Sequence, residues 1–156
     1  MQLIASDSRA SIRAMIGSVL PKGRAASAPD YISPDGADIR LVLRPEVEGT
    51  ANHSVCEASF AASQVSRAIR RRTVEESWYV LEGEAEVWRK PPGADPATGT
   101  VTTIVSGEAL NIPVGYSFQV RAWTRGRVRL LCSTVPPWPG PDEAIPDEGG
   151  LGAPTR

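Results

Sequence analysis

The sequence has 156 residues, which is enough for one domain with a single hydrophobic core and too few for two ordinary domains. Its composition, 41% hydrophobic and 22% charged, is typical of a globular protein, and the formal net charge of −1 offers no overall basic field for nucleic acid or an anionic membrane. No apolar run is long enough for a transmembrane helix and the N-terminus lacks the basic residues of a secretory signal, so we expect a cytoplasmic protein.

The first predicted element is a helix over residues 7–20, where apolar residues recur at helical spacing and Pro21 ends the run. Residues 21–36 are rich in Ala, Ser, Pro and Gly, so residues 1–36 are expected to form an N-terminal helix and arm. From Ile39 onward, short strand-like runs alternate with Gly and Pro turns, which is typical of an all-β sandwich or barrel. The expected strands are 39–43, 53–60, 65–72, 76–82, 84–90, 101–105, 108–112, 117–122 and 127–135.

The C-terminal segment differs from the predicted barrel of residues 37–135. Four prolines between positions 136 and 141 remove backbone donors and fix φ, so this stretch cannot form regular strand or helix. We expect an extended strap, with Trp138 docked on the barrel or on a partner. Residues 147–156 are predicted to be disordered, which makes residues 136–156 a Pro-rich strap and tail.

Two segments of the predicted barrel contain Gly, Pro and Glu residues at characteristic spacings. Glu76 and Gly83 lie in a predicted hairpin with six residues between them, and Gly107, Pro113 and Gly115 follow as Gly, five residues, Pro-x-Gly. Proline presets φ and glycine accepts positive φ, so the second segment suits a tight turn. Both segments, in this order, resemble the two conserved motifs of the cupin superfamily. The resemblance covers about residues 55–135 and implies a cupin-type double-stranded β-helix, a jelly-roll barrel, with a short N-terminal helix or arm.

The same resemblance implies a metal site of three histidines and one glutamate, and here the sequence departs from it. The first-motif histidine positions fall on Arg70 and Arg72, or on Ile69 and Arg71 if the longer spacing applies, and the second-motif position holds Phe118. Arginine stays protonated and has no lone pair to donate, so it cannot be a ligand. We therefore expect neither a metal nor a cofactor.

Other potential ligands are few. The single histidine of the chain, His53, could join Glu76 and Cys56 in an improvised metal site, although a strand histidine satisfied by a hydrogen bond is the simpler interpretation. Cys56 and Cys132 have neither CxxC spacing nor the density of a disulfide scaffold. Both are expected to be reduced thiols packed in strands.

A ligand site can replace the metal inside the barrel. Alternate residues of a strand share a face, so Arg70 and Arg72 are expected to point inward together and to bind a carboxylate, phosphate or enolate. Two other interpretations stay open, namely an internal pair of one arginine with Glu76, and an arginine run that is solvated. The ligand-binding candidates are Arg70, Arg72, Trp78, Tyr116 and Phe118, of which Trp78 and Phe118 would form an apolar wall.

Three functions are consistent with these residues. The first is a metal-independent cupin that binds or transforms a small organic molecule, anionic or aromatic. If it is an enzyme, isomerase, epimerase, cyclase or lyase chemistry would use Glu76 or His53 as the base and Tyr116 as a proton donor. The second is a non-catalytic structural or dimerisation cupin, and the third is a metal-dependent, oxygenase-like cupin with atypical ligands. A homodimer is expected, formed through the helix and the Trp138 strap, with no nucleic acid or membrane partner.

Overall fold

The computed structural model describes residues 21–156, and the helix predicted over residues 7–20 lies outside them. Within the described part, none of the helices is long and apolar enough to span a membrane. Regular structure there is almost entirely β, and the elements in chain order are β1 (Tyr31–Ile32), β2 (Asp38–Leu43), α2 (Pro45–Glu48), β3 (Ser54–Phe60), β4 (Ile69–Arg71), β5 (Glu75–Glu82), β6 (Glu84–Lys90), the 3-10 turn η1 (Pro96–Thr98), β7 (Thr100–Val105), β8 (Ala109–Ile112), β9 (Ser117–Ala122), β10 (Val128–Val135), the 3-10 turn η2 (Pro141–Glu143) and β11 (Ala144–Pro146).

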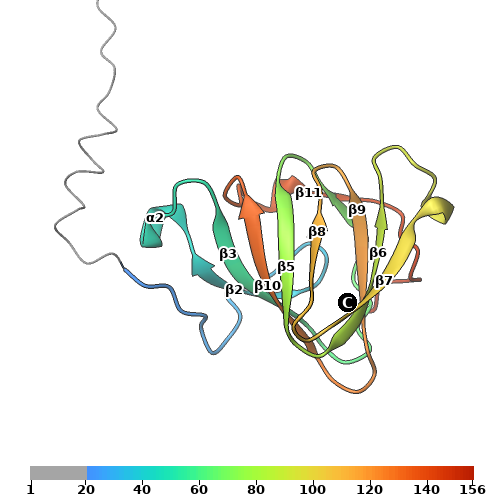
Figure 1. Ribbon diagram of the computed structural model, residues 1–156, viewed down its shortest axis with the longest axis horizontal. Coiled ribbons are helices and arrows are strands. Elements are labelled where there is room, and N and C mark those ends of the chain that lie inside the picture. The colour runs from blue at the N-terminus through green and yellow to red at the C-terminus, as the bar shows by residue number, and fades with distance from the viewer. Residues whose placement is uncertain (1–20) are drawn as a thin grey trace, which may run out of the picture.

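The strands form two antiparallel sheets, which confirms the predicted all-β fold. A six-stranded sheet has the order β1-β2-β3-β10-β5-β8 and a five-stranded sheet has the order β11-β4-β9-β6-β7 (Figure 1). Strands distant in sequence are neighbours in both sheets, as where β10 pairs with β3 and β5. The first and last strands extend the regular structure beyond the predicted barrel of residues 37–135.

The core lies between the sheets because the strands alternate in polarity. In β5, residues Glu76, Trp78 and Val80 are buried, while their neighbours face outward. The inner face of β10 is built in the same way from Val128, Leu130, Cys132 and Thr134. One contiguous hydrophobic cluster joins the inner faces of both sheets.

The two motif turns form as their residue types predict. Gly83, with φ of 86°, connects β5 to β6, and a side chain there would meet the backbone carbonyl of Arg127. Gly115, with φ of 78°, follows Pro113, whose carbonyl accepts a hydrogen bond from Tyr116 N at 3.1 Å. Both glycines therefore occupy backbone conformations that other residues adopt only with strain.

The C-terminal tail differs from the predicted disorder. Leu151 is buried with Val65 and Trp88, and its backbone N–H donates to Gln119 Oε1 at 2.8 Å. Gln119 Nε2 in turn donates to the carbonyl of Gly152 at 2.8 Å. The tail covers the outer face of β9, which explains why that strand is buried on both faces. Tail residues lack strand periodicity, so their anchoring could not be predicted locally.

Candidate functional site

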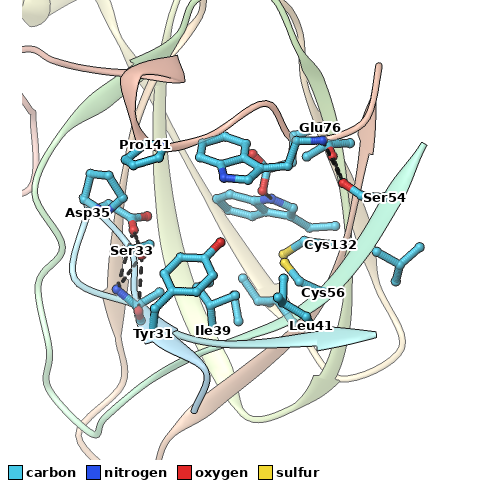
Figure 2. A pocket seen from close by; sticks show the side chains of 18 of the residues that line it. Tyr31, Ser33, Asp35, Ile39, Leu41, Ser54, Cys56, Glu76, Cys132 and Pro141 are labelled. Carbon is cyan, nitrogen blue, oxygen red and sulfur yellow. Dashed lines mark hydrogen bonds between the residues drawn. The ribbon is translucent and has the colours of Figure 1, made fainter. Parts of the chain in front are cut away.

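A cavity of about 580 Å³ opens on the inner face of the six-stranded sheet (Figure 2). Apolar side chains from β2, β3 and β10 form much of its wall, namely Ile39, Leu41, Ala58, Phe60 and Leu130. Charged and polar groups gather where the sheet meets the C-terminal strap, namely Tyr31, Ser33, Asp35, Arg71, Glu76 and Trp138. The volume and the mixture of an apolar wall with a few polar groups are typical of small-molecule sites.

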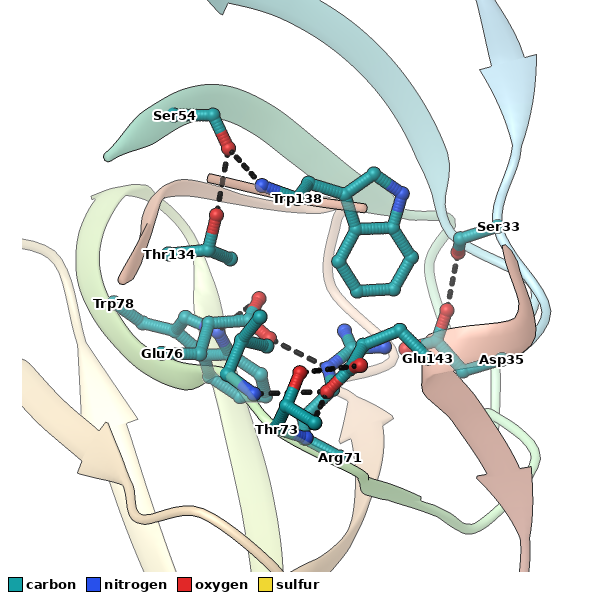
Figure 3. Close-up of polar contacts among 11 residues, drawn as sticks. Ser33, Asp35, Ser54, Arg71, Thr73, Glu76, Trp78, Thr134, Trp138 and Glu143 are labelled. Atoms are coloured by element: carbon teal, nitrogen blue, oxygen red, sulfur yellow. Dashed lines mark hydrogen bonds and ion pairs between the residues drawn. The ribbon is translucent and has the colours of Figure 1, made fainter. Parts of the chain in front are cut away.

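Arg71 and Glu76 form a buried ion pair in this cavity (Figure 3). Arg71 Nε donates to Glu76 Oε2 at 2.8 Å, and Trp78 Nε1 donates to Glu76 Oε1 at 2.9 Å. The two charged residues are 6% and 4% exposed. Arg71 Nη1 is also buried and has no hydrogen-bond partner among the described residues. The carboxylate is therefore satisfied on both oxygens, whereas the guanidinium retains capacity for another acceptor.

Two aromatic rings enclose the guanidinium. Its central carbon lies 5.2 Å from the centroid of Phe118 and 4.7 Å from that of Trp138. The Trp138 backbone N–H donates to Ser54 Oγ at 2.9 Å, so the strap docks on the barrel of its own chain. Burial alone would lower the pKa of Arg71, but the nearby carboxylates of Glu76 and Asp35 raise it, which keeps the arginine charged.

The structure corrects which arginine enters the barrel. In β4, Ile69 and Arg71 are buried, Arg70 is half-buried, and Arg72 lies beyond the strand and is exposed. Neither Arg70 nor Arg72 lines the cavity. Pairing with β9 places Ile69 opposite Phe118, and Arg71 accepts a hydrogen bond on its carbonyl oxygen from Gly115 N at 3.1 Å. The inward-facing positions are therefore Ile69 and Arg71, as the longer of the two motif spacings predicts. The prediction that Arg70 and Arg72 point into the barrel is wrong by one residue.

Asp35 is a site residue that the sequence analysis missed. It is 4% exposed, lines the cavity and accepts a hydrogen bond from Ser33 Oγ. The Ser33-Pro34-Asp35-Gly36 turn holds it, because Gly36 N donates to the Ser33 carbonyl at 2.9 Å. Burial raises the pKa of Asp35, although Arg71 opposes the shift. The sequence Ser33-Pro34-Asp35-Gly36 does predict a turn, but polar turns of this kind usually lie on the surface, so it gave no sign that Asp35 is buried.

Three further polar side chains line the same cavity as the Arg71–Glu76 ion pair, namely Tyr31, Ser54 and Thr134. Burial and the nearby Cys56 raise the pKa of Tyr31 to about 12, so its hydroxyl stays protonated at neutral pH. Ser54 Oγ and Thr134 Oγ1 share a hydrogen bond of 2.6 Å beside the Trp138 backbone (Figure 3). These groups supply hydroxyl donors and acceptors to the cavity wall.

The other predicted site residues occupy different environments. Trp78 lines the cavity and makes an edge-to-face contact with Phe118, with ring centroids 5.2 Å apart. Phe118 is fully buried in the core and does not line the cavity. Tyr116 packs against the core and His53 is half-buried before β3, and neither side chain lines the cavity. The structure thus brings Glu76 and Trp78 together with Arg71 and leaves His53 and Tyr116 outside.

The donor set does not fit the metal that the cupin motifs imply. The four corresponding positions hold Ile69, Arg71, Glu76 and Phe118, and only the glutamate can be a ligand. Arg71 already satisfies one oxygen of that glutamate. Across residues 21–156, no group of three or more His, Cys, Asp or Glu side chains is arranged to hold a metal ion, so His53, Cys56 and Glu76 do not come together as the improvised site would require.

The comparisons with known proteins agree with this architecture. No model of a known protein family matches the sequence. The chain is 24% identical over 115 residues to the uncharacterized protein MJ1618 of Methanocaldococcus jannaschii, covering 74% of this chain and 86% of that protein. The structure of the present chain is similar to that of oxalate decarboxylase from Bacillus subtilis, which has Mn(II) centers. The TM-score is 0.64, with 16% identity over 83% of this chain.

That decarboxylase is much longer, and the chain spans 33% of it. A second similar structure is the cupin domain of Schizosaccharomyces pombe Cnp3, with a TM-score of 0.51 and 14% identity over 63% of this chain and 64% of that domain. At these identities both likenesses establish architecture rather than activity. The chain therefore has the cupin fold, a jelly-roll barrel of two antiparallel sheets.

Proposed function

We propose that the protein binds a small organic acid with an apolar body in the barrel cavity, without a metal. The observation that carries the proposal is Arg71, which lines the cavity with a buried guanidinium nitrogen that has no partner among the described residues. An unsatisfied buried donor costs about 1–3 kcal/mol, so an acceptor bound beside Arg71 would recover part of that free energy. The apolar wall would contact the rest of the molecule.

Charge balance supports a monocarboxylic acid. Arg71 and Glu76 neutralise each other, and an added carboxylate would leave one excess negative charge near Glu76. Asp35 relieves this repulsion when it is protonated, the form that its raised pKa favours, because a neutral carboxyl group can donate a hydrogen bond to the ligand. Recognition would thus combine one charged donor, Arg71, and one neutral donor, Asp35.

The binding test compares acids with matched neutral molecules. Thermal unfolding is measured with benzoate, phenylacetate and octanoate, and with benzamide and octanol as neutral controls. A ligand that binds only the folded state raises the melting temperature with concentration. We expect the acids to stabilise the wild type more than the neutral molecules do, and increasingly so as the pH is lowered, because protonation of Asp35 removes its negative charge from the cavity.

Two variants assign the effect to the site. Arg71→Met combined with Glu76→Gln removes both charges and keeps an acceptor for Trp78, so it should fold and lose the preference for acids. Arg72→Met removes an exposed arginine from the same run and should bind as the wild type does. Equal stabilisation by acids and neutral molecules, or an unchanged acid preference in the double variant, would contradict the proposal.

Acid–base catalysis on the bound molecule is a second candidate function, favoured by the position of Asp35 beside Arg71 in the cavity. In its ionised form the Asp35 carboxylate can take up the proton from the carbon next to the carboxylate of a substrate held by the guanidinium, and in its protonated form it can return a solvent-derived proton to the same carbon. Proton exchange at the carbon next to the carboxylate of a bound acid, followed by NMR in deuterated water, tests this function. Exchange should be lost in Asp35→Asn while binding is retained.

A further inference from the structure

The two cysteines of the chain lie directly opposite each other on neighbouring strands. Cys56 of β3 is the register partner of Cys132 of β10, and both are free thiols. Both side chains line the cavity, and their sulfur atoms face each other beside Leu41 and Tyr31 (Figure 2). Their pairing is independent of the Arg71 site, although they share its cavity.

This placement suits a disulfide without movement of the strands. Directly opposed residues of an antiparallel pair have Cα atoms about 4.5–5.5 Å apart, and disulfides join Cα atoms about 4.4–6.8 Å apart. A bond between these two sulfurs would therefore link β3 to β10 within the existing register.

We propose that Cys56 and Cys132 form a peroxide-reactive dithiol site, in which an organic hydroperoxide that enters the cavity oxidises the pair to a disulfide. Cys56 is half-buried and Cys132 is 2% exposed, so the incoming peroxide meets Cys56 first. The apolar wall beside the thiols, formed by Leu41, Ala58 and Leu130, favours a hydroperoxide with a hydrocarbon body over hydrogen peroxide.

The reaction balances in two steps. The Cys56 thiolate attacks the terminal peroxide oxygen, an S–O bond forms as the O–O bond breaks, and the alkoxide leaves as an alcohol after taking up a proton. The Cys132 sulfur then displaces the hydroxyl group of the Cys56 sulfenic acid, which leaves as water with the thiol proton. The two thiols lose two electrons, and the hydroperoxide is reduced to one alcohol and one water.

The surroundings of Cys132 fit the role of the second thiol. The neighbouring Cys56 thiol, together with burial, raises the pKa of Cys132, which favours its protonated form while Cys56 reacts first. Direct oxidation of Cys132 by solvent oxidants is restricted by the same burial. The pair should therefore cross-link rather than proceed to sulfinic acid.

The test uses the reduced full-length protein with equimolar cumene hydroperoxide or hydrogen peroxide. Thiols are counted with Ellman's reagent after denaturation, and the intact mass is measured without reductant. We expect the wild type to lose both thiols and two hydrogens while remaining a single chain, to react faster with cumene hydroperoxide, and to recover both thiols in dithiothreitol.

Two variants separate the roles of the thiols. Cys132→Ser should accumulate a sulfenic acid on Cys56 that dimedone traps, whereas Cys56→Ser should react several-fold more slowly than the wild type. The proposal is overturned if the wild type keeps both thiols, forms sulfinic acid without a bridge, or cross-links only between chains. Because these three outcomes are measured on the wild type, they test the dithiol proposal even if a variant fails to fold. They are also independent of whether organic acids bind in the cavity.

Discussion

The Arg71–Glu76 pair provides the sharpest test of how this cavity is built. Arg71→Met leaves a carboxylate that is 4% exposed with Trp78 as its remaining side-chain donor. Breaking a buried pair by removing one partner costs about 3–5 kcal/mol, because the other charge stays buried without compensation. Against the roughly 5–15 kcal/mol that stabilises a typical domain, this loss is large but does not have to unfold the protein.

Replacing both charges should restore most of the lost stability. In Arg71→Met with Glu76→Gln, no charge remains buried and the glutamine oxygen can still accept from Trp78 Nε1. The methionine also keeps apolar contact with Phe118 and Trp138, the two rings that enclose Arg71. We expect the double variant to lie within about 2 kcal/mol of the wild type, since neutral replacement of a buried pair is often tolerated.

Urea unfolding followed by tryptophan fluorescence measures these free energies by linear extrapolation. Arg72→Met serves as the matched control, because it removes an exposed arginine next in sequence and should change the free energy of unfolding by less than about 0.5 kcal/mol. The pair does not hold a buried charge in the way described if Arg71→Met lowers the free energy of unfolding no more than Arg72→Met does, or if the double variant is as unstable as Arg71→Met.

Three further predictions concern other parts of the barrel. Burial raises the pKa of Asp35, so the folded state retains a proton that the unfolded state releases, and the free energy of unfolding falls as the pH rises above about 4, the ordinary pKa of aspartate. In thermal unfolding, Asp35→Asn should therefore gain stability relative to the wild type as the pH is raised from about 4, and a difference that does not change with pH would contradict this. In urea unfolding, Gly83→Ala should lower the free energy of unfolding more than Gly107→Ala does. Both glycines have positive φ, but only a side chain at position 83 would meet the backbone carbonyl of Arg127. Equal losses of about 1 kcal/mol would show that the positive φ alone accounts for the effect. Leu151→Ala should lose about 2 kcal/mol and increase amide hydrogen exchange along the outer face of β9, whereas no change in exchange would mean that the tail does not protect this strand.

The all-β fold and the lack of the usual metal-ligand residue types could be predicted from the sequence alone. Alternation of apolar and polar residues in β5 and β10, and the turns at Gly83 and Gly115, depend on neighbouring residues only, so they could be predicted. The absence of ligating residue types at the positions of Arg71 and Phe118 is likewise a property of the side chains themselves.

The set of groups that meet in the cavity depends on long-range contacts and could be read from the folded chain only. Arg71 rather than Arg70 or Arg72 faces inward because β4 is held in register by β9 on one side and β11 on the other. Asp35 is buried because a turn in the N-terminal arm folds into the barrel, where Arg67 N donates to its backbone carbonyl at 2.9 Å. The run Arg70-Arg71-Arg72 has the same residue type on both faces of the strand, so its local pattern could not show which arginine is buried, and pairing with segments far apart in the chain settles it.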